Sequence, residues 1–149
     1  MTATGHALIG TVIAAKVGDP ALAIPLALGS HILADMLPHW DTGTNGRAKT
    51  KQIFFLASLA DVVLGFVLSY LLIIFLFPTT DLFYAFIIII ASQFFDWATA
   101  PYLFFNMKIP PFIWFYRFQK SFDNRLDSKI GMLSQALVVI FLIIIAQII

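Results

Sequence analysis

Three long apolar stretches constrain this chain more than any other feature. They cover residues 53–77, 82–105 and 130–149, and none of them contains more than one charged side chain. A helix of about 20 apolar residues is long enough to cross the ~30 Å hydrocarbon core of a bilayer. The composition agrees, since 60% of the 149 residues are hydrophobic and only 11% are charged. The sequence therefore predicts an all-α integral membrane protein.

Two shorter apolar segments precede the long stretches. Residues 5–17 are too short for a full crossing, because they give ~20 Å of helix against the ~30 Å core. Asp19 and Pro20 form a helix-start signal for a second segment at residues 20–37. We expect these two segments to form a short hairpin that crosses the bilayer only in part. The prediction is a bundle of about five helices in a single domain over residues 1–149.

The Lys and Arg residues predict an orientation. Residues 40–52 contain three and residues 106–130 contain five, whereas the turn at residues 78–81 contains none. Because positively charged loops stay on the cytoplasmic side, both basic loops are expected to be cytoplasmic in a multi-pass protein of the cell membrane. The basic residues lie in short loops rather than in a stripe, and the net charge is only +1, so no nucleic-acid partner is expected.

The segment at residues 30–41 carries four ionisable side chains of the metal-ligand type directly after an apolar run. His31 and Asp35 are four residues apart, so a helix places them one turn apart on one face. A proline then disfavours helical geometry, which leaves His39 and Asp41 on a turn that could fold back to the same face. The segment contains no Lys or Arg, so a divalent metal ion is a candidate partner for these groups.

Two further carboxylates lie inside the long apolar stretches. Asp61 lies about nine residues after the start of its stretch and Asp96 about nine residues before the end of the next, so antiparallel packing puts both ~14 Å from one membrane face. A carboxylate at membrane depth costs at least ~2.5 kcal/mol on insertion scales, and such residues usually face an interior or a wet cavity. Asp61 and Asp96 are therefore the candidate catalytic residues, and they are expected to converge with the histidines of the chain.

The expected metal ligands are His6, His31, Asp35, His39 and Asp41. Imidazole and carboxylate ligands match a borderline-hard divalent ion, so zinc is expected, with manganese as the alternative. The chain has no Cys, which excludes thiolate sites and disulfides. These candidates exceed what one tetrahedral zinc ion needs. Either two metals bind, or some of the residues orient the ligands and serve as general base.

Purely structural roles are the alternative for the same residues. Asp61 and Asp96 could be neutral acids that are hydrogen-bonded to their own helices. His31 and Asp35 could be a hydrogen-bonded pair one helical turn apart, and His6 could lie at the membrane interface.

The motif Gly-His-Ala-Leu-Ile-Gly near the start and the later motif Leu-Pro-His-Trp-Asp resemble the membrane-bound metal-dependent hydrolases related to the LexA-regulated inner-membrane protein. Those proteins typically open with a His-containing helix and a Leu-Pro-Asp-x-Asp-His type turn. The resemblance covers residues 5–41, about a quarter of the chain. It implies metal-ligand roles for His6, Asp35, His39 and Asp41. The order of acid and imidazole around the proline differs, and the Arg-Gly-x-Thr-His-Ser type motif is missing, so other acids would have to supply those ligands.

Together these features predict a membrane-embedded metal-dependent hydrolase that acts on a lipid or a lipid-linked phosphate or ester near the cytoplasmic leaflet. Its partners would be membrane lipids and a lipid-like substrate. One alternative is a proton or cation transporter, since His and Asp midway in helices also mark such pathways. Five short helices are few for a transporter, so this alternative requires a homo-oligomer. Another is a non-catalytic membrane scaffold whose polar residues hold its helices together.

Overall fold

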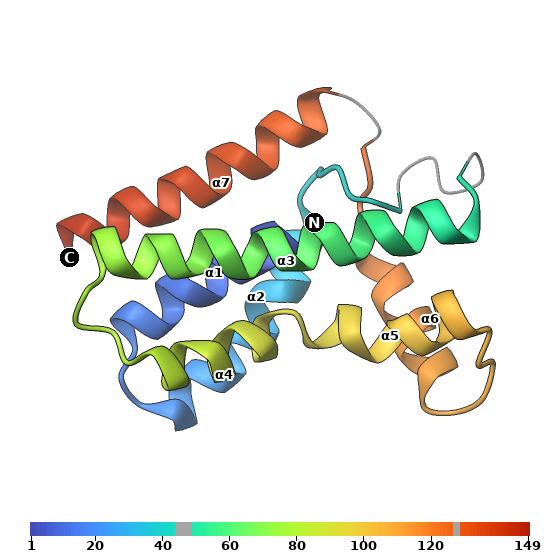
Figure 1. Ribbon diagram of the computed structural model, residues 1–149, viewed down its shortest axis with the longest axis horizontal. Coiled ribbons are helices and arrows are strands. Elements are labelled where there is room, and N and C mark those ends of the chain that lie inside the picture. The colour runs from blue at the N-terminus through green and yellow to red at the C-terminus, as the bar shows by residue number, and fades with distance from the viewer. Residues whose placement is uncertain (44–48, 127–128) are drawn as a thin grey trace.

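The computed structural model describes residues 1–43, 49–126 and 129–149, and these residues form seven helices and no strand (Figure 1). In chain order the helices are α1 (Ala3–Lys16), α2 (Pro20–Met36), α3 (Lys51–Leu76), α4 (Leu82–Ser92), α5 (Phe94–Phe105), α6 (Phe112–Phe122) and α7 (Lys129–Ile148). The expected all-helical class is confirmed. The expected count of five helices is wrong, because residues 82–105 form two helices and residues 112–122 form a helix that was not predicted.

α1 is the central helix of the bundle and packs against α2, α3, α4 and α7. Glycines on both sides of its interfaces allow close approach. A Cβ atom at Gly10 would lie 3.2 Å from the Cα atom of Ile89 in α4, and a Cβ atom at Gly65 in α3 would lie 3.1 Å from the Cα atom of Thr4 in α1. Such small residues are typical of membrane helix interfaces, where close van der Waals contact drives association.

α3 and α7 are each long and apolar enough to cross a membrane, and α4 and α5 together qualify as one broken span. The 26 residues of α3 correspond to about 39 Å of helix, which exceeds the ~30 Å core and requires tilt. Large apolar side chains are exposed along both unbroken helices, among them Leu56, Val63 and Phe75 of α3 and Leu137 and Phe141 of α7. Such extensive exposed apolar surface is suited to lipid rather than water. The chain is therefore a membrane protein.

α4 and α5 meet at Gln93 with a bend of 54°. The Gln93 side-chain amide donates a hydrogen bond of 2.9 Å to the carbonyl oxygen of Ala3. Ser92 Oγ donates one of 2.8 Å to the carbonyl oxygen of His6. These contacts with the beginning of α1 favour a break at this position. The apolar pattern of residues 82–105 continues through the break, which is why a single helix was expected there.

α6 lies within residues 106–130, the segment that was expected to be a basic loop. None of its residues is fully buried. It packs mainly against α5, where the rings of Tyr102 and Tyr116 stack with centroids 4.1 Å apart. An amphipathic helix that mixes aromatic and basic side chains is suited to the membrane–water interface.

The two basic loops lie side by side where they are described. An isolated parallel bridge between His39 and Arg125 joins them. Residues 44–48 of the first loop and residues 127–128 of the second lie outside the described residues. The cytoplasmic location of the loops stays a prediction.

Candidate metal centre

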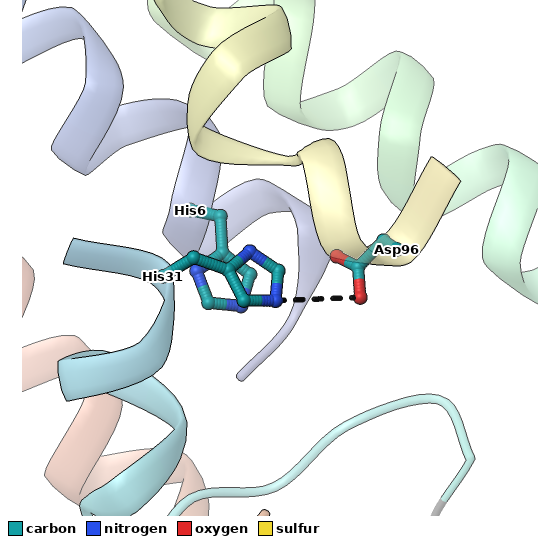
Figure 2. A group of neighbouring side chains, drawn as sticks. All are labelled: His6, His31 and Asp96. Carbon is teal, nitrogen blue, oxygen red and sulfur yellow. Dashed lines mark ion pairs between the residues drawn. The ribbon is translucent and has the colours of Figure 1, made fainter. Parts of the chain in front are cut away.

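Five segments bring His and Asp side chains together inside the protein: the first turns of α1, the last turns of α2, the loop after α2, the first turn of α5 and the loop after α6. Figure 2 shows His6 from α1, His31 from α2 and Asp96 from α5 facing one another. Each of these residues offers one ligand atom that lies within 4.8 Å of the other two. This cluster could hold a metal ion.

Asp35 of α2 lies at the centre of the group, and its side chain is only 2% exposed. Its Oδ1 atom lies 3.1 Å from His6 Nε2 and 3.8 Å from His39 Nε2. Its Oδ2 atom lies 3.3 Å from His31 Nε2. The amino group of Met1 also contacts Oδ1. All three histidines of the chain therefore direct Nε2 at one buried carboxylate.

Backbone carbonyl groups orient two of the imidazole rings. His31 Nδ1 lies 2.7 Å from the carbonyl oxygen of Ser92, and His39 Nδ1 lies 2.8 Å from that of Leu37. A carbonyl oxygen only accepts hydrogen bonds, so in a neutral ring Nδ1 carries the proton and Nε2 carries the lone pair. Donation from one ring nitrogen to a carbonyl, with the other nitrogen directed at the ion, is the usual arrangement of a metal-binding histidine.

The rings of His6 and His31 stack on each other, with centroids 3.7 Å apart and an angle of 9° between the planes. Two protonated imidazoles at this distance would repel, so the stack disfavours a charge on both rings. His6 Nδ1 is buried and has no hydrogen-bond partner within the described residues. A buried polar atom without a partner is uncommon and indicates a missing ligand or a functional role.

Asp96 lies on the outer side of this group, and its side chain is 32% exposed. Its Oδ1 atom lies 3.8 Å from His31 Nε2 and accepts a 3.0 Å hydrogen bond from the Gln119 amide of α6. Its Oδ2 atom is buried and has no hydrogen-bond partner in the described part of the chain. The Gln119 amide also lies 3.4 Å from Asp35 Oδ2. Gln119 was not among the predicted site residues, because α6 was not expected to be a helix.

His39, Asp41 and Asp123 form a second group of candidate ligands, again with ligand atoms within 4.8 Å of one another. Asp123 Oδ1 lies 3.3 Å from His39 Nε2. The loop after α6 is held in place by Asn124, whose N–H donates a 2.9 Å hydrogen bond to the carbonyl oxygen of Asp35 and whose carbonyl oxygen accepts one of 3.2 Å from His39 N–H. No local sequence pattern indicates Asp123, since only this tertiary pairing brings it to the site.

Arg125 pairs with both acids of the second group. Its Nε atom lies 3.0 Å from Asp41 Oδ2 and also contacts Asp123 Oδ2. Burial would raise the pKa of Asp123, but the His39 contact and the charge of Arg125 outweigh burial and hold the pKa below its usual value. Burial would lower the pKa of Arg125, but Asp41 and Asp123 raise it, so the guanidinium stays charged.

Asp61 lies at the N-terminus of α1 rather than in either group. Its Oδ2 atom accepts a 2.7 Å hydrogen bond from Ala3 N–H. Its Oδ1 atom accepts bonds of 3.2 Å from Thr4 N–H and 2.7 Å from Thr4 Oγ1. Asp61 of α3 therefore caps the neighbouring helix, whose free N–H groups and positive dipole end favour an anion. Both carboxylate oxygens are engaged in this capping.

A cavity of about 390 Å³ lies between α3 and α5 and reaches the ligand groups. Its polar lining includes Asp41, Asp61, Asp96, Gln119 and Arg125. The remaining walls are largely apolar and aromatic, and they include Phe54, Leu59, Val62, Trp97 and Phe104. An apolar chamber with a few convergent polar groups is the usual form of a site for an amphiphilic small molecule.

The donor atoms of both groups fit a divalent ion. Imidazole lone pairs and carboxylate oxygens that face one another in the interior repel unless a cation lies between them. Nitrogen and oxygen ligands without sulfur suit zinc or manganese. The candidate ligands available in the two groups are His6, His31, Asp35, His39, Asp41, Asp96 and Asp123. Comparison with known protein families, curated proteins and solved structures found no match for this chain.

Proposed function

We propose that this protein is a membrane-embedded metal-dependent hydrolase that acts on a lipid or a lipid-linked phosphate or ester. One observation carries the proposal. His31 and His39 each donate a hydrogen bond from Nδ1 to a backbone carbonyl oxygen, and each ring directs Nε2 at carboxylate oxygens. Buried lone pairs and buried carboxylates in this arrangement call for a cation, and a divalent metal ion satisfies both kinds of ligand.

In this proposal His6, His31 and Asp35 hold the ion. When bound, a divalent ion acidifies water and polarises a phosphoryl or acyl oxygen. Asp96 is the proton acceptor, because its Oδ2 atom lacks a hydrogen-bond partner among the described residues. Gln119 fixes the Asp96 carboxylate through Oδ1 and so keeps Oδ2 available. The proposal assigns no catalytic step to Asp61, whose two oxygens cap α1.

The cavity supports an amphiphilic substrate. Arg125 lines it and keeps its charge while it pairs with Asp41 and Asp123, so its remaining N–H groups can donate hydrogen bonds to a polar head group. Phe54 and Phe104, whose ring centroids lie 5.0 Å apart, belong to the apolar wall that would accept a hydrocarbon chain. The site lies at the level of Asp61, ten residues after the start of α3 at Lys51 and so about 15 Å along that helix. Under the predicted orientation, this depth is in the cytoplasmic leaflet.

The test is hydrolysis by the purified protein in detergent micelles that contain phosphatidic acid or phosphatidylcholine, followed as released phosphate or fatty acid. We expect EDTA to abolish turnover and zinc or manganese to restore it. His31→Ala and Asp96→Asn should lose turnover by more than ~100-fold, as expected for groups at the reacting centre. Asp81→Asn is the matched control, since Asp81 caps α4 away from the site. Full lipid hydrolase activity in a metal-free preparation would refute the proposal.

The break between α4 and α5 favours a second candidate function, the transport of protons or divalent cations. Discontinuous membrane helices commonly lie at ion and substrate sites in transporters, and this break adjoins a partly buried acid, Asp96. Transport would require an oligomer of this small chain. Flux of protons or divalent cations into liposomes that Asp96→Asn abolishes, without any lipid hydrolysis, would support transport over hydrolysis.

A further inference from the structure

We propose that the second group, His39, Asp41 and Asp123, is a second divalent-cation site that shares Asp35 with the first. This inference rests on the proposed function, because it extends the same metal centre. It assigns two ions to each chain, one bound mainly by α1 and α2 and the other by the two loops that the His39–Arg125 bridge joins.

The first support is the burial and orientation of the His39 ring. Its side chain is fully buried at 0% exposure. Nδ1 donates to the carbonyl oxygen of Leu37, which leaves Nε2 as the ring atom that faces the carboxylates. Nε2 has no hydrogen-bond partner within the described residues. It lies 3.3 Å from Asp123 Oδ1 and 3.8 Å from Asp35 Oδ1. A buried imidazole nitrogen directed at two carboxylates needs a proton or a metal cation between them, and a metal ion would satisfy all three groups at once.

The second support is that Arg125 contacts one oxygen of each acid, which leaves the other oxygen of Asp123 to face His39. The guanidinium contacts Oδ2 of both Asp41 and Asp123. Asp123 thereby directs its other oxygen, Oδ1, at His39. Arg125 thus acts from outside the group and orients the acids, as outer partners of metal-bound carboxylates commonly do.

The third support is the position of Asp35 between the two groups. Its Oδ2 atom lies 3.3 Å from His31 Nε2, in the first group. Its Oδ1 atom lies 3.1 Å from His6 Nε2, also in the first group, and 3.8 Å from His39 Nε2, in the second. A carboxylate that lies between histidines of both groups is in the position expected of a ligand that bridges two ions. Paired ions about 3.5–4 Å apart are common in enzymes that cleave phosphate esters, where they stabilise the attacking and the leaving oxygen.

The experiment is zinc stoichiometry by equilibrium dialysis and elemental analysis of the full chain in detergent. We expect two zinc ions per chain for the wild type. His39→Gln and Asp123→Asn should each retain one ion, and His31→Gln should also retain one. Thermal unfolding in detergent checks that each variant is folded. Asp123 lies directly after α6, and its replacement by Asn preserves the side-chain size. Asp123→Asn therefore tests the second site even if His39→Gln fails to fold. Asp81→Asn should retain both ions.

A single zinc ion in the wild type that His31→Gln loses and His39→Gln keeps would overturn the second site and leave the proposed function intact. A single ion lost in both variants would also overturn it, since one site would then contain both histidines. No bound zinc or manganese in the wild type would overturn the second site and the proposed function together. Manganese loading adds an independent readout, because two adjacent ions couple magnetically and reduce the electron-paramagnetic-resonance signal expected from separate ions.

Discussion

Asp35 places a negative charge in the protein interior within 3.8 Å of all three histidines. Removing a carboxylate from water costs several kcal/mol even after the protein relaxes. Contacts of Asp35 with the amino group of Met1 and the side-chain amide of Gln119 offset part of this cost. At the scale of single residues, a bound cation would therefore offset more of the cost of burying Asp35.

We predict that Asp35→Asn lowers zinc affinity by more than the ~10–100-fold loss that is typical of changes to the outer partners of a metal ligand. The amide preserves the shape of the carboxylate but not its charge, so a direct ligand is lost without a cavity. Competition with a chromophoric chelator measures the affinity. Asp19→Asn is the matched control, because Asp19 only caps the exposed start of α2. Equal zinc affinity of Asp35→Asn and wild type would contradict a role of Asp35 in metal binding.

We predict a different result for Asp61. Asp61→Ala should lower the free energy of unfolding by about 1–2 kcal/mol, the usual cost of a lost helix cap, and should leave the zinc content unchanged. The physical reason is that the amide groups of Ala3 and Thr4 lose their acceptors. Unfolding in mixed detergent micelles measures stability. Wild-type stability combined with lost turnover would instead support the catalytic role expected from the sequence.

At the scale of helices, the contact between α1 and α4 depends on the absence of a side chain at Gly10. A Cβ atom there would lie 2.9 Å from Ser92 Cβ and 3.2 Å from Ile89 Cα. Gly29 in α2 is the contrasting case, because a Cβ atom there would meet nothing within 4 Å.

Gly10→Ala should therefore destabilise the protein by about 1–3 kcal/mol through overpacking. It should also weaken zinc binding, because it displaces Ser92, whose carbonyl oxygen orients His31. Gly29→Ala should stabilise by about 0.5–1 kcal/mol, the gain in helix propensity. Unfolding midpoints of the two variants, measured side by side, test the difference in sign. Equal shifts for both would show that α1 and α4 do not pack this closely.

The helices also show what local patterns predict. Apolar length predicted the membrane-spanning character of α3 and α7, and the four-residue spacing of His31 and Asp35 placed them on one face of α2. The bend at Gln93 was not predictable, because its cause is a hydrogen bond to Ala3 of α1, a contact between residues far apart in the sequence. Asp123 and Gln119 were not predictable for the same reason. Their positions depend on how the segment after α5 folds back on α2.

At the scale of the whole molecule, the orientation in the membrane stays a prediction that the absence of Cys makes easy to test. Single-cysteine variants Lys51→Cys and Lys108→Cys should react with an impermeant maleimide from the cytoplasmic side, and Thr79→Cys from the opposite side. The reason is the retention of positively charged loops in the cytoplasm. Labelling of intact cells and of inverted vesicles shows from which side of the membrane each cysteine reacts. Labelling of Lys51→Cys and Thr79→Cys from one side would refute the predicted topology.

The cavity between α3 and α5 has a consequence for kinetics. Several of its wall residues, including Phe55, Trp97 and Phe105, are themselves exposed on the apolar flank of the protein. A molecule dissolved in the surrounding lipid can therefore reach this chamber sideways, without first entering water. The relevant substrate concentration for such a chamber is the mole fraction in the bilayer plane. Adding inert lipid while the total amount of substrate stays constant should slow turnover, whereas adding buffer should leave turnover unchanged.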